Sequence, residues 1–129
     1  MDRPIAEFMS SPVFTVGVSQ SVAEARRRMI EHETRHLVVL RGGHLRGIVS
    51  DRDLTLAEGI LAEGAAEETT VEDVMSADTF EIGKDAPTSQ VAQTMAGKRI
   101  GAAIIVEDGQ PVGIFTTTDA LRALAATLA

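Results

Sequence analysis

The chain has 129 residues, no cysteine, a formal net charge of −7 at pH 7 and a hydrophobic fraction of 44%. This length and apolar content suit one compact domain or two small units that share a core, and the lack of cysteine excludes disulfides and thiolate chemistry. The acidic charge argues against nucleic-acid binding, and the absence of a signal-like N-terminus or of a membrane-length apolar run predicts a cytoplasmic protein without membrane insertion.

Two copies of one pattern make up most of the chain, because residues 5–55 align without a gap with residues 71–121. The identical pairs are Met9/Met75, Ser10/Ser76, Phe14/Phe80, Gly17/Gly83, Met29/Met95, Gly43/Gly109, Gly47/Gly113, Ile48/Ile114 and Asp53/Asp119. Such a repeat indicates a duplicated structural unit. We expect the apolar faces of the copies to be buried against each other, with a ligand at their boundary.

Each copy shows the same local signals in the same order. A short helical turn and an extended segment come first, then a helix that starts after Ser21 in one copy and at Pro87 in the other. A hairpin of two strands follows, and after it a final helix with an apolar face. These faces comprise Leu54, Ala57 and Leu61 in the first copy and Leu121, Leu124, Ala125 and Leu128 in the second. The sequence therefore predicts an α+β protein of two β-α-β-β-α units, joined by a linker at residues 63–70.

The junction between the last strand and the final helix carries the strongest chemical signal. It reads GIVSDRD at residues 47–53 and GIFTTTD at residues 113–119. In both copies a hydroxyl, Ser50 or Thr116, is placed at a helix N-terminus, where unpaired amides and the helix dipole favour an anion. An aspartate one turn further on, Asp53 or Asp119, can accept hydrogen bonds from ribose hydroxyls. The spacing suits a nucleotide.

A second interpretation of the same motif stays open. Ser/Thr-x-x-Asp is also an ordinary capping arrangement, in which the hydroxyl caps the third amide and the aspartate offsets the dipole. The two roles can coexist. Arg52, which has Thr118 as its match in the second copy, could reach a phosphate or could be a solvated helix residue.

The other polar residues have plain structural interpretations. Most of the cations lie in the first copy, so any anion site should favour it, although the run Arg26, Arg27 and Arg28 is interpreted as a solvated helix face. His36 is interpreted as structural, and the three histidines lack a spacing typical of metal ligands, so we expect no metal. Met29 and Met95 are interpreted as core residues.

On these residues the chain resembles a tandem pair of CBS domains, a family named after cystathionine β-synthase. The resemblance runs from Ile5 to Leu124 and rests on the Met-Ser entry motif, the first-helix methionine, RHL at residues 35–37, the strand turns, GIVSDRD and GIFTTTD. Three features depart from the family pattern, one of which is that the second copy lacks a basic residue inside its motif GIFTTTD. Val38 stands where the family often has proline, and the second copy has Gly101 and Ala102 in place of an Arg-His strand start.

The resemblance implies CBS domains at residues 5–62 and 71–128, related by a pseudo-two-fold axis with their sheets face to face. It also implies up to two clefts for an adenosine-containing ligand such as AMP, ADP, ATP or S-adenosylmethionine, and a flat homodimer. The implied nucleotide-binding residues are Ser50, Arg52, Asp53, Thr116, Thr118 and Asp119 in the motifs, with Val13, Phe14, Thr15, Arg35, His36, Leu37, Thr79, Phe80, Glu81, Gly101, Ala102 and Ala103 along the strands.

The sequence thus predicts a non-catalytic regulatory module that senses an adenosine-containing ligand, needs no cofactor and signals to a partner such as an enzyme or a transporter in trans. The alternative is a structural interaction dimer whose nucleotide pockets are vestigial and unoccupied. An enzyme would require a nucleophile–base pair or a metal, and the sequence offers neither.

Overall fold

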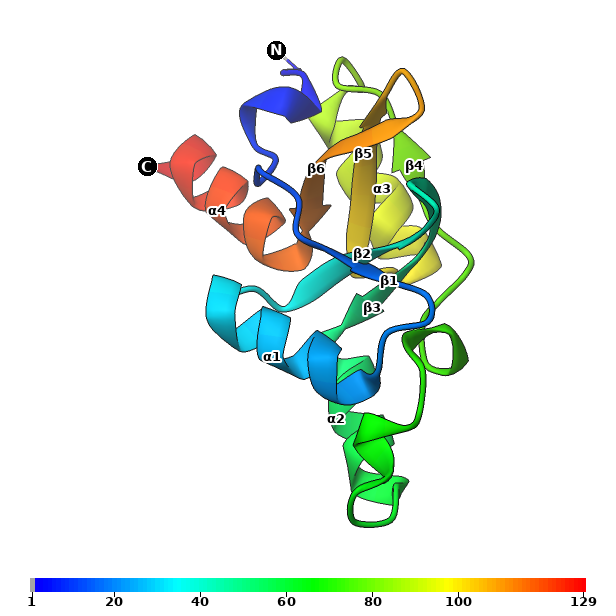
Figure 1. Ribbon diagram of the computed structural model, residues 1–129. Helices are drawn as coiled ribbons and strands as arrows, with labels where there is room; N and C mark the ends of the chain where they lie inside the picture. Colours follow the sequence, from blue (N-terminus) through cyan, green and yellow to red (C-terminus); the bar gives the residue numbers. More distant parts are fainter. Residues whose placement is uncertain (1) are drawn as a thin grey trace. The chain divides into compact units, whose positions relative to one another are not determined.

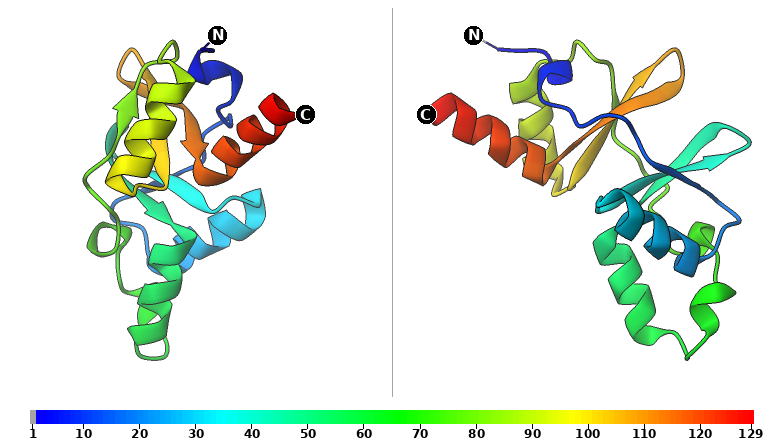
Figure 2. Two further views of the ribbon diagram at one scale, coloured as in Figure 1. Left: turned by 180° about the vertical axis from the view of Figure 1, so that it is seen from behind. Right: turned by 60° about the vertical axis from the view of Figure 1, so that its left-hand side comes forward.

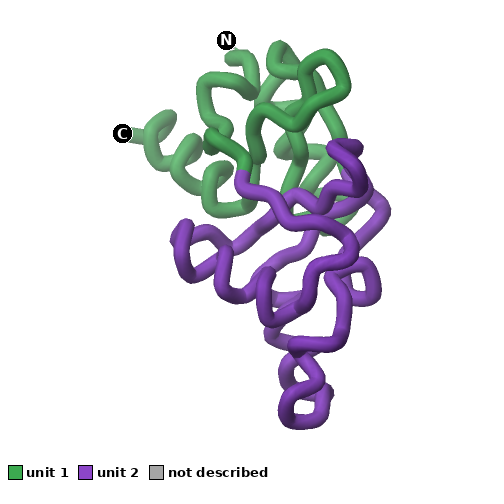
Figure 3. Tube along the Cα trace, in the orientation of Figure 1, with its two compact units in different colours: residues 1–13, 80–129 green, residues 14–79 purple. Residues whose placement is uncertain are grey.

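The computed structural model describes residues 2–129, which form two three-stranded sheets and four α-helices. The chain divides into two compact units, unit 1 with residues 1–13 and 80–129, and unit 2 with residues 14–79 (Figures 1 and 3). Each unit has the predicted order β-α-β-β-α, so the α+β class is confirmed. The predicted domain boundaries follow the duplicated sequence, whereas the compact units change over near residues 13 and 79.

Unit 2 is built on a sheet of strand order β1-β2-β3, in which the first pair is parallel and the second antiparallel. A parallel pair needs a crossover, and α1 supplies it. In chain order the elements are β1 (Thr15–Gly17), α1 (Val22–His32), β2 (His36–Arg41), β3 (His44–Ser50), α2 (Asp51–Ile60) and the 3₁₀ turns η2 (Ala65–Glu67) and η3 (Val71–Asp73). Ser21 caps α1 by accepting from the Glu24 amide at 3.0 Å.

Unit 1 repeats this arrangement with strand order β4-β5-β6. Its elements are the 3₁₀ turn η1 (Ile5–Glu7), β4 (Glu81–Ile82), α3 (Thr88–Lys98), β5 (Ala102–Glu107), β6 (Gln110–Thr116) and α4 (Thr117–Leu128). Within unit 1, α3 lies against one face of this sheet (Figure 2). Pro87 is the N-cap of α3 and gives no side-chain cap, but the Asp2 carboxylate accepts the Ser89 amide at 3.1 Å.

The N-terminal arm of each copy is built into the unit that holds the other copy. In unit 1, Ser10 and Ile114 of β6 exchange backbone hydrogen bonds of 2.8 and 3.0 Å. In unit 2, Ser76 and Ile48 of β3 do the same at 2.9 and 3.0 Å. The exchange explains why the chain order and the compact units disagree.

Two glycines make this close approach possible. A Cβ atom added to Gly47 would lie 2.6 Å from the Ser76 carbonyl oxygen and 2.8 Å from the Met75 sulfur. A Cβ at Gly113 would meet the Met9 side chain but no backbone atom. The Met-Ser pair of each copy therefore contacts the Gly-Ile pair of the other copy, and this contact is made once in each unit.

Each unit has its own apolar core, and the arms contribute to both. Ile5 is fully buried in the core of unit 1 with Val91, Met95 and Phe115, whereas its counterpart Val71 is fully buried in the core of unit 2. The core role predicted for Met29 and Met95 is confirmed, since they are 3% and 5% exposed.

The final helices differ in how their predicted apolar faces are used. In α2, Leu54 and Ala57 are buried as expected. In α4 the predicted leucine face is on the surface: Leu121, Leu124 and Leu128 are 61%, 53% and 76% exposed. Ala123 and Asp119 are the buried residues of this helix. The helical period correctly placed the leucines on one face, but small side chains on another face contact the core.

Candidate functional site

One end of the sheet in unit 2 collects the residues that the sequence predicted as a binding site. The start of β2 lies opposite the end of β3, so that His36 pairs with Ser50. The Arg35 carbonyl accepts the first amide of α2, from Asp51, at 2.7 Å, and the Phe14 carbonyl accepts the Val38 amide at 3.0 Å. Strand register thus places the starts of β1 and β2 beside the N-terminus of α2.

Unit 1 shows the same arrangement at the matching end of its sheet. Ala102 pairs with Thr116, the Gly101 carbonyl accepts the Thr117 amide at 3.1 Å, and the Phe80 carbonyl accepts the Ile104 amide at 2.8 Å. The backbone around the two motifs is therefore the same in both units, and the differences lie in the side chains.

The predicted site residues separate into one set in each unit. Unit 2 holds Phe14, Thr15, Arg35, His36, Leu37, Ser50, Arg52, Asp53 and Thr79. Unit 1 holds Val13, Phe80, Glu81, Gly101, Ala102, Ala103, Thr116, Thr118 and Asp119. Only Val13 and Thr79, at the unit boundaries, fall outside the unit of their own copy. That these residues bind a ligand, and that the ligand lies between the copies, stays a prediction.

Both motifs form complete capping boxes. In unit 2 the Ser50 hydroxyl accepts the Asp53 amide at 3.0 Å, and the Asp53 carboxylate accepts the Ser50 amide at 2.8 Å. In unit 1 Thr116 and Asp119 make the same pair of bonds at 3.2 and 2.9 Å. The capping interpretation is thus confirmed for both copies. It leaves one carboxylate oxygen of each aspartate outside the box.

The second oxygen has different surroundings in the two units. Oδ1 of Asp119 accepts a hydrogen bond from the Ser10 hydroxyl at 2.8 Å, and Nη1 of Arg122 lies 3.5 Å from it. Asp119 is 4% exposed. Asp53 is half-buried, and no residue in the described range 2–129 makes a hydrogen bond or ion pair with its Oδ1. The contact with Ser10 was not predicted, although Ser10 belongs to the repeated Met-Ser motif.

Most arginines of unit 2 are bound in ion pairs, which corrects the solvated-face interpretation of the α1 run. Arg26 donates to Asp51 at 2.6 Å and to Glu58 at 2.9 Å, both on α2. Arg27 and Arg28 pair with Glu24, and Arg28 also reaches the Thr15 carbonyl at 2.8 Å. These side chains are therefore engaged in holding unit 2 together.

The cations that remain available in unit 2 are few. Within residues 2–129, its arginines without an ion pair are Arg35, Arg46 and Arg52, all exposed. A hydrogen bond from Arg26 lowers the pKa of the Asp51 carboxyl, and the charges of Arg35 and His36 add to this effect. Arg35 and Arg52 therefore lie near the N-terminus of α2, beside the carboxylates of Asp51 and Asp53 in its first turn. Unit 1 has Gly101 and Thr118 at the positions of Arg35 and Arg52.

The histidines do not gather around a common point. The rings of His32 and Phe14 are stacked with centroids 4.1 Å apart, which fixes the Phe14 ring beside the start of β1. His36 is half-buried at the start of β2. Across the described residues there is no group of three or more His, Cys, Asp or Glu side chains that could hold a metal ion.

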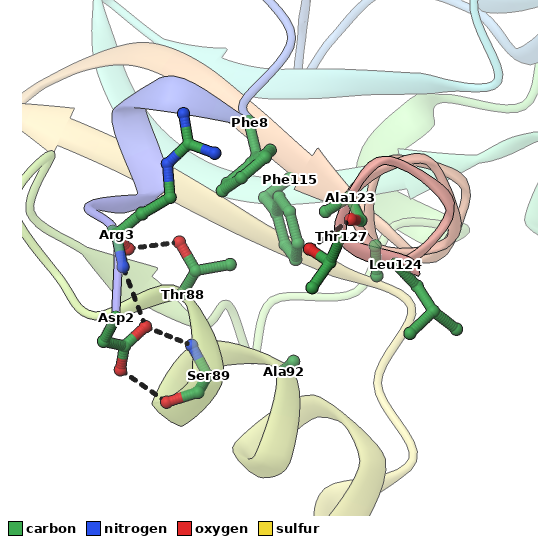
Figure 4. A pocket seen from close by; sticks show the side chains of 11 residues that line it. Asp2, Arg3, Phe8, Thr88, Ser89, Ala92, Phe115, Ala123, Leu124 and Thr127 are labelled. Carbon is green, nitrogen blue, oxygen red and sulfur yellow. Dashed lines mark hydrogen bonds between the residues drawn. The ribbon is translucent and has the colours of Figure 1, made fainter. Parts of the chain in front are cut away.

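Sequence reasoning missed a cavity in unit 1. It has a volume of about 470 Å³ and lies between α3, α4 and the N-terminal arm (Figure 4). The interior is apolar, with the rings of Phe8 and Phe115 and the methyl groups of Ala92 and Ala123. Arg3, Thr88 and Ser89 lie at its edge. The small residues that line it, such as Ala92 and Ala123, were a sequence signal for this cavity, but the helix pattern was interpreted from its leucines.

Within residues 2–129, each helix is too short or too polar to cross a bilayer.

Comparison with known proteins gives the following similarities. The family model described as "CBS domain" matches residues 5–59 and 71–126. An inosine-5′-monophosphate dehydrogenase of Korarchaeum cryptofilum is 35% identical over 87% of this chain, which spans only 22% of that protein. The CBS domain-containing protein YhcV of Bacillus subtilis is 30% identical over 89% of this chain and 81% of its own length.

Solved structures also resemble this chain along nearly its whole length. One of them is the CBS domain pair of protein MJ0100 in complex with 5′-methylthioadenosine and S-adenosyl-L-methionine. The TM-score is 0.87 at 26% identity, and the similarity covers 98% of this chain and 99% of the other.

Proposed function

The chain belongs to the CBS domain family as a tandem pair, and from this premise we propose that it is a regulatory module that binds an adenosine-containing ligand. The observation that supports this most directly is the unused Oδ1 of Asp53, beside a helix N-terminus with unpaired arginines nearby. A related CBS pair was solved with two adenosine-containing ligands, which supports the ligand class.

The proposed roles follow from the chemistry of unit 2. Asp53 keeps its capping bond through Oδ2 and accepts the ribose hydroxyls through its free oxygen. An ionised carboxylate provides about four acceptor positions, so the two roles are compatible. The half-buried ring of Phe14, stacked on His32, provides a surface for the base, whereas the side chain of Leu37 is fully buried in the core.

A phosphate or another acidic group of the ligand would be bound by the cations at the start of α2. Arg35 and Arg52 are exposed and unpaired within the described chain, and guanidinium groups bind phosphate with two parallel hydrogen bonds. Unit 1 has neutral residues at both positions, so we expect a charged ligand to prefer unit 2. This agrees with the prediction that an anion site favours the first copy.

We further propose that the ligand acts as a signal and not as a substrate. The two motifs use their hydroxyls as helix caps, and a hydroxyl that accepts an amide hydrogen bond is not arranged as a nucleophile. A ligand changes a conformational equilibrium only by its differential affinity for the two states. The output would therefore be read by a partner, an enzyme or a transporter regulated in trans.

The alternative, an interaction module with vestigial pockets, is favoured by one observation. Both motif aspartates already have a structural task in a capping box. In that case adenosine-containing compounds would not change the melting temperature. Replacing Asp53 would only lower the free energy of unfolding, by about 0.5–2 kcal/mol as for other lost caps.

A thermal-shift panel with AMP, ADP, ATP, S-adenosylmethionine, NAD and GTP separates the two functions. Bound ligand raises the melting temperature by mass action, so at least one adenosine compound should raise it while GTP does not. Calorimetry on the compound with the largest shift then compares the wild type with Asp53→Ala and with Asp78→Ala, an exposed carboxylate of unit 2. Loss of binding only in Asp53→Ala supports the ribose role, and a flat panel contradicts the function.

We also propose that the chain forms a homodimer through α3 and α4. The face of α4 carries exposed Leu121, Leu124 and Leu128, and the cavity of unit 1 lies directly beside it. In a two-fold dimer the same surface occurs on both subunits, so an element that carries both exposed leucines and a neighbouring hollow can bind its own copy.

The dimer is tested by size-exclusion chromatography with light scattering. Leu124→Glu with Leu128→Glu should give a monomer. The matched control is Ile60→Glu on α2. Ile60 is equally apolar and 87% exposed, and its replacement should leave the measured molar mass equal to that of the wild type. A dimer that survives the α4 changes but is lost in the control would assign the interface to unit 2.

A further inference from the structure

We propose that Ser10 occupies the motif aspartate of unit 1, so that the first adenosine-containing ligand is bound through Asp53 alone. This inference rests on the proposed function and specifies which of the two motifs is available. Its basis is the hydrogen bond of 2.8 Å from the Ser10 hydroxyl to Oδ1 of Asp119. That atom is the counterpart of the oxygen that is free on Asp53.

The carboxylate of Asp119 has more hydrogen-bond partners than that of Asp53. Oδ2 of Asp119 accepts the Thr116 amide at 2.9 Å and the Thr116 hydroxyl at 3.1 Å. Its Oδ1 accepts Ser10 and lies 3.5 Å from Arg122. Asp53 accepts only the Ser50 amide, through Oδ2, among all described residues. A ribose diol needs two acceptor positions, which Asp53 offers without breaking a bond and Asp119 does not.

The backbone of Ser10 is held in place, so its hydroxyl stays within reach of Asp119. Backbone hydrogen bonds of 2.8 and 3.0 Å hold Ser10 against Ile114 of β6, and the Met9 side chain fills the space beside Gly113. A ribose in unit 1 would have to replace the hydrogen bond from the Ser10 hydroxyl to the Asp119 carboxylate. We expect this replacement to weaken binding there by about tenfold or more.

The arm of unit 2 shows that the contact between serine and motif aspartate is not common to both arms. Ser76 has the same backbone pairing with Ile48, at 2.9 and 3.0 Å. Its side chain is exposed, and within residues 2–129 its hydroxyl makes no hydrogen bond to Asp53. The two arms are therefore alike in backbone and differ in whether the serine hydroxyl reaches the motif aspartate.

The inference makes Ser10 a residue that decides how many ligands one chain binds. With Ser10 in contact, we expect one ligand per chain at concentrations near the dissociation constant. Removing the hydroxyl leaves Oδ1 of Asp119 with only the Arg122 contact, at 3.5 Å and from a side chain that is 74% exposed, so a second, weaker site should appear.

Isothermal titration calorimetry with AMP, and in parallel with S-adenosylmethionine, tests this on the full chain. We expect a stoichiometry of one for the wild type and for Ser76→Ala, the matched control. Ser10→Ala should raise it towards two, with the second site within about 100-fold of the first. Asp119→Ala should keep the wild-type affinity within about threefold, whereas Asp53→Ala should lose at least 30-fold.

The outcomes separate this inference from the proposed function. If the wild type binds neither probe, the proposed function fails and this inference fails with it. If the wild type binds two molecules with equal affinity, or if Ser10→Ala still binds one, only the inference is overturned. Asp119 is buried and caps α4, so Asp119→Ala is used only if its circular dichroism matches the wild type. Ser10→Ala, which removes one hydroxyl group, decides the question without it.

Discussion

Units 1 and 2 repeat the same strands, registers and capping boxes, yet they hold their two helices together differently. In unit 2 the side chain of Arg26 on α1 donates to Asp51, Thr55 and Glu58 of α2, and we call these four residues the arginine cluster. In unit 1 the matching positions carry Ala92, Thr117, Leu121 and Leu124. Two of them, Ala92 and Leu124, line the cavity between α3 and α4.

The comparison distinguishes what the fold requires from what each unit has added. Both units keep the methionine and the glycine where the arm crosses the last strand, because the arm forms backbone hydrogen bonds with that strand and the methionine side chain packs against the glycine. The helix pair is held by ions in one unit and left open in the other, so the sheet does not depend on how the helices meet. An open apolar helix pair is available for another molecule, whereas an ion-paired one is already satisfied.

The largest loss of stability should come from substituting the glycine that each N-terminal arm crosses. Both units have this glycine, but an added methyl group would meet a backbone oxygen in unit 2 and only a side chain in unit 1. Gly47→Ala places a methyl group 2.6 Å from a backbone oxygen, that of Ser76, which cannot move without moving the arm. We expect it to lower the free energy of unfolding by about 1–3 kcal/mol. Gly113→Ala meets only the flexible side chain of Met9 and should cost less.

Urea unfolding of both alanine variants measures this difference. Gly59→Ala, at a helical position with open space around it, is the control for the intrinsic effect of the substitution. Equal losses at Gly47 and Gly113 would contradict the assignment of the backbone oxygen as the obstacle in unit 2.

Local patterns of the sequence were sufficient for the elements of the fold. The caps at Ser21, Ser50 and Thr116, the turns and the core methionines all depend on residues close together in the chain or on one helix face. For the same reason the order β-α-β-β-α could be predicted in each copy.

The exchange of the arms could not be predicted, because the repeat does not say which copy an arm contacts. Ile5 and Val71 are both apolar and both fully buried, so hydropathy alone does not assign an arm to a core. The same limit applies to the site: the bond between Ser10 and Asp119 joins residues 109 positions apart. The exposed leucines of α4 show the corresponding limit of periodicity, which finds an apolar face but not its partner.

A smaller effect should follow from opening the arginine cluster, which would make unit 2 resemble unit 1. Arg26→Ala removes hydrogen bonds to Glu58 and Asp51 from a side chain that is only 24% exposed. These acceptors are partly solvated, so we expect a loss of about 1 kcal/mol, reduced at high salt.

The control for this change is Arg27→Ala on the same helix. Arg27 pairs with Glu24 and Glu67 but is 58% exposed, and its replacement should cost a few tenths of a kcal/mol. Unfolding free energies at low and high salt measure both variants. If the two losses were the same, the cluster would not be what holds α1 to α2.

The smallest effect should be the loss of stability at low pH through the arginine cluster. Unit 1 has no such contribution, because Thr117 stands at the position of Asp51. The hydrogen bond from Arg26 lowers the pKa of Asp51 in the folded state below its unfolded value of about 3.9. A group of this kind stabilises the fold above the unfolded pKa, and the contribution is lost as the pH falls through the folded pKa. Asp51 is largely solvated, so we expect only a few tenths of a kcal/mol.

The measurement compares unfolding free energies at pH 7 and pH 3 for the wild type, Asp51→Asn and Asp78→Asn. Asp51→Asn should be less stable than the wild type at pH 7, and the difference should shrink at pH 3, because protonation removes the same charge progressively as the pH falls through the folded pKa. Asp78→Asn, which changes an exposed carboxylate outside the cluster, should follow the wild type at both values. A constant difference between Asp51→Asn and the wild type across this range would mean that the carboxylate charge does not contribute to joining the two helices of unit 2.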